Sequence, residues 1–183
     1  MNITLVNATE EKGNTQKMKD TFLNAMGEGN LTSEVFLPRD FPGSCIRCYN
    51  CTCETGLSEC PFSQYTVPLW EKFLKTNLFV FILPADALNV PEHLNALLDH
   101  YYASYMADAP EANMISRQAV VLTADKSFVL GKNTREMKEA LNKWGFSYIH
   151  TIQQSFLGAD TSFQMKCERT VEKIKSYHLS VNA

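Results

Sequence analysis

The chain has 183 residues, of which 45% are hydrophobic and 20% are charged, and its formal net charge is -3. This length suffices for one well-filled hydrophobic core and is too short for two domains of ordinary size. We therefore expect a single domain over 1–183. The small negative charge gives no general attraction to nucleic acid or to an anionic membrane surface. We expect neither as a partner, so local backbone geometry would have to hold any bound phosphate.

We expect no export signal at the N-terminus. The chain enters an apolar run at Ile3 without the basic, then apolar, then small-residue order of a signal peptide. No apolar stretch approaches the roughly 18 residues that a spanning helix needs. We expect a soluble cytoplasmic protein, in which thiols stay mostly reduced and clustered cysteines favour metal or redox roles over structural disulfides.

Apolar runs alternate with helical stripes along the chain. Continuous or alternating apolar residues predict five strands, at 3–6, 31–37, 78–83, 119–122 and 146–152. Apolar residues three or four positions apart predict a helix after each strand. These stripes contain Met18, Phe22 and Met26; Leu69, Phe73 and Leu74; Leu94, Leu97 and Leu98; Met137, Leu141 and Trp144; and Phe163, Cys167, Val171 and Ile174. Pro91 suits the first position of the third helix, and Gly145 is placed to end the fourth in a left-handed turn.

Five strands alternating with five helices predict an α/β three-layer sandwich. Its sheet would be parallel and five-stranded, with right-handed crossovers and helices on both faces. Ligands of such sheets bind outside the carboxyl ends of the strands, where the strand order reverses. The loops after Val6, Leu83 and Thr123 are therefore the expected ligand-binding loops.

The loop after the first strand ends in Gly13-Asn14-Thr15, at the expected start of a helix. Free backbone N–H groups and the helix dipole favour an anion at such a position. Gly13 permits a close approach of the backbone, and the side chains of Thr9, Asn14 and Thr15 can donate hydrogen bonds to phosphate oxygens. The structural alternative is that Asn14 caps the helix and Gly13 is an ordinary turn residue.

Five of the six cysteines lie in a segment at 43–61 that has neither helical nor strand periodicity, so we expect an excursion over the surface. They are Cys45, Cys48, Cys51, Cys53 and Cys60. The first three can turn their sulfurs towards one centre, and Cys60 or Cys53 would supply a fourth ligand. Thiolates in this arrangement suit a four-iron four-sulfur cluster or a structural zinc ion. The alternatives are free thiols in a loop and a thioredoxin-type pair of Cys45 and Cys48.

These motifs resemble those of the flavodoxin-like NADPH-dependent FMN reductases and their iron–sulfur flavoprotein relatives. Such proteins typically open with a strand, Gly-Ser-Pro-Arg, a few residues and then Gly-Asn-Thr. This chain keeps Gly13-Asn14-Thr15 but has Asn7-Ala8-Thr9-Glu10 at the earlier position. The spacing of Cys45, Cys48 and Cys51, followed by Cys60, is similar to the cysteine pattern that these proteins often carry.

Further matches extend about as far as the fifth strand. Where many family members have Asp-Asp-Met, this chain has Gln64-Tyr65-Thr66. Pro84-Ala85-Asp86 stands in the place of Pro-Val-Tyr. The segment from Asn95 to His100, ending in Asp-His, stands in the place of Lys-x-x-x-Asp-Arg.

The resemblance implies a flavodoxin-like fold with an FMN held against the first turn. The phosphate would be bound by residues of that turn, with Thr9 and Lys12 in place of the absent serine and arginine. These residues are Thr9, Lys12, Gly13, Asn14 and Thr15. The isoalloxazine ring would meet backbone N–H groups of the loop after the third strand, which consists of Pro84, Ala85, Asp86, Ala87, Leu88 and Asn89. Without the resemblance, we would interpret this loop as an ordinary connection between a strand and a helix, with Asn89 as the cap of that helix.

The resemblance also implies a function. It indicates an FMN-dependent oxidoreductase of the NAD(P)H-dependent FMN or quinone reductase type, which passes electrons to a small acceptor and forms a homodimer. One alternative is an iron–sulfur flavoprotein electron carrier with Cys45, Cys48, Cys51 and Cys60 as cluster ligands. Another is a binding or regulatory protein of the same fold that has lost its cofactor. We name no catalytic side chain, because a flavin itself carries the redox chemistry. We expect His100 on a helix surface.

Overall fold

Five parallel strands form one sheet at the centre of the computed structural model. The structure describes residues 1–9, 13–43, 48, 56–84, 89–107, 116–125, 132–155 and 160–181. In these ranges the strands are β1 (Asn2–Asn7), β2 (Leu31–Phe36), β3 (Leu78–Ile82), β4 (Gln118–Asp125) and β5 (Tyr148–Ser155). The helices are α1 (Asn14–Met26), α2 (Ser63–Leu74), α3 (Glu92–Ala107), α4 (Lys132–Lys143) and α5 (Asp160–Val181), with a short 3-10 helix η2 (Gly56–Glu59) before α2.

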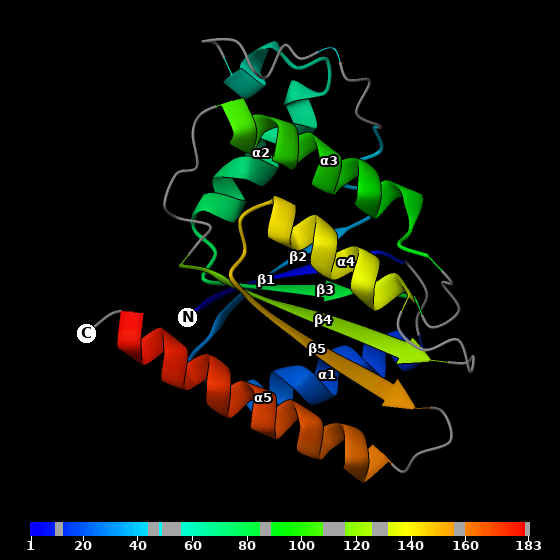
Figure 1. The fold of residues 1–183 in the computed structure, drawn as a ribbon, viewed down its shortest axis with the longest axis vertical. Coiled ribbons are helices and arrows are strands. Elements are labelled where there is room, and N and C mark those ends of the chain that lie inside the picture. The colour runs from blue at the N-terminus through cyan, green and yellow to red at the C-terminus, as the bar shows by residue number, and fades with distance from the viewer. Residues whose placement is uncertain are drawn as a thin grey trace.

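The strand order is β2-β1-β3-β4-β5, and every neighbouring pair is parallel. Helices α1 and α5 cover one face of the sheet, and α2, α3 and α4 cover the other (Figure 1). This is the flavodoxin-like strand order, with the reversal between β1 and β3. The predicted three-layer α/β architecture is confirmed.

Strand β3 occupies the middle of the sheet, and all five of its residues are buried. Phe79 and Phe81 point towards α2, α3 and α4, where they belong to one hydrophobic cluster, whereas Val80 belongs to the cluster beneath α1 and α5. The aromatic rings of the first cluster pack edge to face, with centroids 5.3 Å apart for Phe73 and Phe79 and 5.8 Å apart for Phe79 and Trp144. Burial on both faces explains why the sequence of β3 is a continuous apolar run.

Helix α4 ends as its sequence predicts. Gly145 has a φ of 95°, its N–H donates to the carbonyl of Asn142, and the N–H of Phe146 donates to the carbonyl of Leu141. This pair of hydrogen bonds is a Schellman motif. Trp144, which we expected within the helix, lies just beyond it, and its side chain is fully buried.

The predicted boundaries of α3 and β5 are shifted. Helix α3 begins at Glu92, and the carbonyl of Pro91 accepts the N–H groups of Leu94 and Asn95. Pro91 therefore precedes the helix instead of being its first residue. Strand β5 begins two residues later than expected and continues to Ser155, because it pairs with β4 along the whole length of that strand. Among the helices that the structure describes, none is both long and apolar enough to cross a membrane.

His150 lies on β5, on the same face as Ile152, which packs beneath α5. Its Nε2 atom is buried and has no hydrogen-bond partner among the described residues. Burial lowers the pKa of His150 from its ordinary value of 6.5, and the positive charge of Lys173 lowers it further. The unfolded chain therefore binds a proton more readily than the folded protein does.

We expect the free energy of unfolding to decrease as the pH falls below about 6.5, because protons then bind preferentially to the unfolded chain. A His150→Gln variant should lose less stability over the same pH interval, although buried His100 contributes in the same direction. Urea denaturation at a series of pH values measures this. His93→Gln, at an exposed position on α3, is the matched control. An unchanged pH dependence in His150→Gln would contradict the assignment.

Candidate functional site

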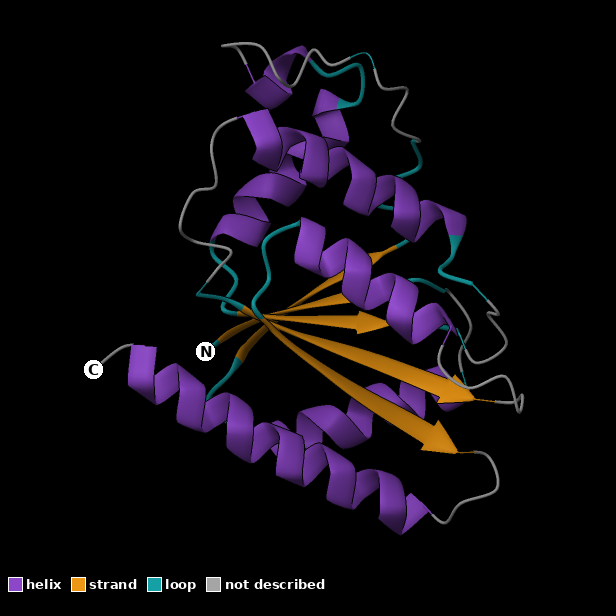
Figure 2. Cartoon of the chain, in the orientation of Figure 1, coloured by secondary structure: helices purple, strands orange, loops and turns teal. Residues whose placement is uncertain are grey.

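The carboxyl ends of β1, β3 and β4 meet at one edge of the sheet. The N–H of Ala8 donates to the carbonyl of Ile82 at 3.0 Å, and the N–H of Leu83 donates to the carbonyl of Leu122 at 2.9 Å. All five strands run towards this edge (Figure 2). Backbone hydrogen bonds between the strands thus continue to their carboxyl ends. The residues that follow β1 therefore begin beside those that follow β3, at the point where the strand order reverses.

Gly13 is the residue that turns the chain into α1. Its φ of 153° and ψ of -126° belong to a region that other residues rarely adopt. A Cβ atom added there would meet no described atom within 4 Å. The conformation requires glycine at this position, and the space in front of the backbone is open in the described structure.

The first turn of α1 presents backbone hydrogen-bond donors. The first hydrogen bond of the helix joins the N–H of Lys17 to the carbonyl of Gly13, so the preceding N–H groups have no partner within the helix. No described side chain caps the helix, and its first turn contains no acidic residue. Asn14 is the first helical residue and is exposed, which contradicts the alternative that it serves as the cap.

Thr15 lies at the second position of α1 and is only 7% exposed. Its hydroxyl makes no hydrogen bond to any described residue. A nearly buried hydroxyl beside free backbone N–H groups is a suitable donor to an anion. Thr9 is half-buried at the end of the segment that follows β1, and Lys12 lies outside the described residues.

The loop predicted to meet a flavin ring is described only at its two ends. Pro84 is half-buried two residues after β3, and Ala85, Asp86, Ala87 and Leu88 lie outside the described residues. The Oδ1 atom of Asn89 accepts a hydrogen bond from Lys132, the first residue of α4, at 2.7 Å. This contact links the loops after β3 and β4. Asn89 therefore does not cap α3, which contradicts the structural alternative.

Cys60 is buried in the connection between β2 and α2. Its Sγ atom lies 3.6 Å from Nε2 of His100 and accepts the N–H of Phe62 at 3.3 Å. Cys48 is exposed, whereas Cys45, Cys51 and Cys53 lie outside the described residues. Within the described part of the chain, no three metal-ligating side chains come together. The cluster stays a prediction, which iron and sulfide analysis of protein purified without oxygen would test.

The prediction that His100 lies on a helix surface is wrong. The residue is 2% exposed, its ring centroid lies 5.7 Å from that of Phe41, and burial lowers the pKa of its imidazole. Its neighbours Phe41 and Cys60 belong to the long connection after β2, which covers this side of α3. His100 and Cys60 are 40 residues apart. No local sequence pattern could have indicated their contact.

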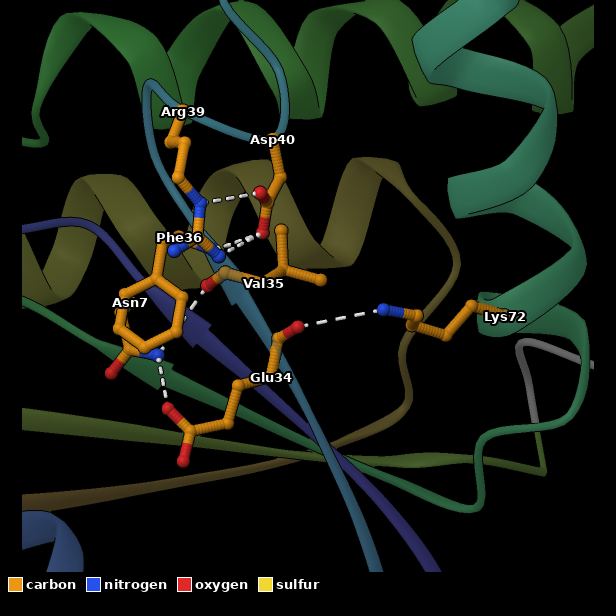
Figure 3. A network of polar contacts seen from close by, with 7 residues as sticks. All are labelled: Asn7, Glu34, Val35, Phe36, Arg39, Asp40 and Lys72. Carbon is orange, nitrogen blue, oxygen red and sulfur yellow. Dashed lines mark hydrogen bonds and ion pairs between the residues drawn. The ribbon is translucent and has the colours of Figure 1, made fainter.

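A polar network that the sequence did not reveal lies at the ends of β1 and β2 (Figure 3). Lys19 of α1 is 7% exposed, and its Nζ atom lies 2.9 Å and 3.0 Å from the two carboxylate oxygens of Glu34. Asn7, the last residue of β1, donates through Nδ2 to Oε2 of Glu34 at 3.2 Å and to the carbonyl of Val35 at 3.4 Å. Lys72 donates to the backbone carbonyl of Glu34 at 3.4 Å.

Beyond β2 the chain folds back on itself through Asp40. The N–H of Phe36 donates to Oδ2 of Asp40 at 2.8 Å, and Arg39 donates to Oδ1 at 2.8 Å. The hydrogen bond from Arg39 lowers the pKa of the Asp40 carboxyl group below its ordinary value. The Arg39 guanidinium also lies 4.6 Å from the centroid of the Phe36 ring. Asp40 therefore organises the end of β2 through Phe36 and Arg39, without a hydrogen bond to Asn7 or Lys19 among the described residues.

We expect Gly13→Ala to lower the free energy of unfolding by about 1–3 kcal/mol, because alanine would have to adopt a backbone conformation that strains it. Urea denaturation without added ligand measures the effect. Asn14→Ala, one residue further along and exposed, is the control and should not destabilise the protein. Equal stability of Gly13→Ala and the parent protein would contradict the conformational requirement.

Comparison with known proteins gives structural likeness alone. No protein-family model and no curated protein sequence matches the chain. An azoreductase from Bacillus anthracis str. Sterne superimposes with a TM-score of 0.70 at 13% identity, over 96% of this chain and 99% of that one. An NAD(P)H:quinone oxidoreductase from Methanothermobacter marburgensis gives 0.65 at 14% identity, over 93% and 94%. An apo NADH:FMN oxidoreductase gives 0.62 at 10% identity, over 94% and 87%. With its strand order, this likeness establishes that the chain has the flavodoxin-like fold.

Proposed function

We propose that this protein is an FMN-dependent oxidoreductase that takes reducing equivalents from NAD(P)H and delivers them to a small acceptor such as a quinone. The observation that carries the proposal is the N-terminus of α1 at the reversal of strand order. Backbone N–H groups without a partner in the helix, the turn at Gly13 and the Thr15 hydroxyl, which bonds to no described residue, lie there together. This donor set suits a phosphate monoester.

The charges of the first turn support the same ligand. The net charge of the chain is -3, so the overall charge of the protein does not attract a dianionic ligand. The first turn of α1 contains no acidic residue, and the nearby carboxylate of Glu34 is paired with Lys19. Local donors and the helix dipole can therefore hold a phosphate where the overall charge cannot.

The position of the second loop supports a ligand that extends from the phosphate along the sheet edge. The strand ends place the residues after β3 next to those after β1, and Asn89 is tied to α4 through Lys132. A ring bound across this edge would lie at the usual ligand position of an open α/β sheet. When bound, FMN would supply hydride and single-electron chemistry, while this chain would bind and orient it.

The similar structures carry names that fit this proposal. They are an azoreductase, an NAD(P)H:quinone oxidoreductase and an NADH:FMN oxidoreductase. All three are reductases by name, and two of the names specify a nicotinamide nucleotide. The likeness at 10–14% identity supports a shared scaffold, and the α1 N-terminus supplies the independent argument for the ligand.

Absorption spectroscopy tests the proposal directly. We expect purified protein, alone or after incubation with FMN, to show flavin bands at about 375 and about 450 nm. The loaded protein should then oxidise NADH or NADPH in the presence of a quinone. A colourless protein that takes up no FMN would contradict the proposal and would favour a binding or regulatory protein of the same fold.

We expect Thr15→Val to weaken FMN binding by about 10-fold or more, because it removes one hydrogen bond to a charged phosphate. Riboflavin, which lacks the phosphate, should bind the variant and the parent protein equally. Fluorescence titration measures both affinities. Thr21→Val is the matched control, since the Thr21 hydroxyl donates within α1 to the carbonyl of Lys17. If FMN binds Thr15→Val as tightly as the parent protein, Thr15 is not a phosphate ligand.

A further inference from the structure

We infer that Asn7 determines specificity at the proposed FMN site, where its amide oxygen accepts a hydrogen bond from a hydroxyl group of the ribityl chain. Lys19 and Glu34 act as positioning residues that hold the Asn7 amide in the required orientation. This inference rests on the proposed function and adds residues to it that no sequence motif indicates.

The first argument is the hydrogen bonding of Asn7. Its side chain is the last of β1 and is only 6% exposed. Its two side-chain hydrogen bonds to described residues both use Nδ2, which donates to Oε2 of Glu34 and to the carbonyl of Val35. The Oδ1 atom receives no hydrogen bond from any described residue. The described residues do not enclose it fully, so part of its surface is accessible. A nearly buried amide thus presents an open acceptor.

The second argument is that the amide cannot rotate by half a turn. A carboxylate and a backbone carbonyl are both acceptors only. The reversed amide would place Oδ1 against Glu34 and Val35, where it would oppose two acceptors instead of receiving a hydrogen bond. Figure 3 shows the amide nitrogen of Asn7 turned towards Glu34 and its oxygen directed away. The acceptor therefore faces away from β2 in a defined direction.

The third argument places this acceptor near the phosphate site. Lys19 lies one helical turn after Thr15, and both face the sheet from α1. Lys19 contacts Glu34, and Glu34 contacts Asn7. The chain of contacts thus runs beneath the beginning of α1. Thr15 and Asn7 are nearly buried residues on facing elements at the same end of the sheet, and no described residue bonds to the hydroxyl of the one or to the amide oxygen of the other.

The Lys19–Glu34 pair has a consequence beyond stability. Lys19 is buried whereas the Glu34 side chain is 33% exposed, and such a pair commonly adds little to stability, because burying the ammonium group costs hydration and solvent screens the carboxylate. Here the paired carboxylate supplies the acceptor that orients Asn7. Lys19 binds both oxygens of Glu34 and holds the carboxylate in place beside the amide.

The chemistry of an acceptor identifies the part of the ligand that it contacts. The oxygens of a phosphate dianion are themselves acceptors, so Oδ1 of Asn7 would not bind them. A hydroxyl group on the carbon chain next to the phosphate ester can donate to Oδ1. Asn7 would therefore favour a phosphorylated polyhydroxyl chain over an apolar chain of the same length.

The test compares FMN with an analogue whose ribityl chain is replaced by a 5-phosphopentyl chain without hydroxyl groups. We expect the parent protein to bind FMN about 3- to 10-fold more tightly than the analogue, the range of one neutral hydrogen bond. Asn7→Ala should bind the two ligands equally. Glu34→Gln should reduce the preference, because a side-chain amide can present either a donor or an acceptor to Asn7 and no longer fixes the direction of its amide. Fluorescence titration measures all affinities.

The ratio of the two affinities within one variant is insensitive to any loss of folded protein. Asp40→Asn is the matched control, because the Asp40 carboxylate contacts Phe36 and Arg39 in the same region and should leave the ratio unchanged. A preference for FMN that survives in Asn7→Ala, or its absence in the parent protein, overturns the inference alone. A parent protein that binds neither ligand overturns the proposed function as well.

Discussion

The arrangement of this protein depends on the parallel pairing of β1 with a neighbour on each side. Residues Ile3 to Asn7 are in register with both β2 and β3. Parallel neighbours can be joined only by crossovers, and right-handed crossovers in opposite directions place α1 on one face and α2 on the other. The strand order therefore reverses at β1. The connections on either side of that point diverge, and the end of β1 is thus the usual ligand position of an open α/β sheet.

Two kinds of polar arrangement lie close to this end of the sheet, and their physics differs. At the start of α1, donors remain open because neither a capping side chain nor a carboxylate in the first turn satisfies them among the described residues. Beneath the helix, Lys19, Glu34 and Asn7 satisfy one another almost completely. Open donors suit an anion, whereas the satisfied network holds a single acceptor in a defined direction. A rigid support below an open site is the arrangement expected of a binding surface.

Several residues of the site could be predicted because their signals are local. Gly13 at a turn before a helical stripe indicates an N-terminus with open N–H groups, and the structure places Gly13 and Thr15 there. Asn7 and Lys19 could not be predicted. A lysine on an amphipathic helix normally reaches solvent, and only the partner Glu34 on a neighbouring strand explains its burial. The burial of His100 could not be predicted for the same reason, because the residues that contact it belong to the connection after β2, which is distant in the sequence.

The sequence by itself determined the α/β alternation, the central position of β3 and the end of α4 at Gly145. These features follow from hydrophobic periodicity and from backbone conformations that act over a few residues. Only the tertiary structure decided the strand order, the burial of Lys19 and His100 and the direction of the Asn7 amide. Each of these depends on which distant element supplies a hydrogen-bond partner or covers a side chain. The open first turn and the oriented amide beneath it are therefore joined only in the folded protein.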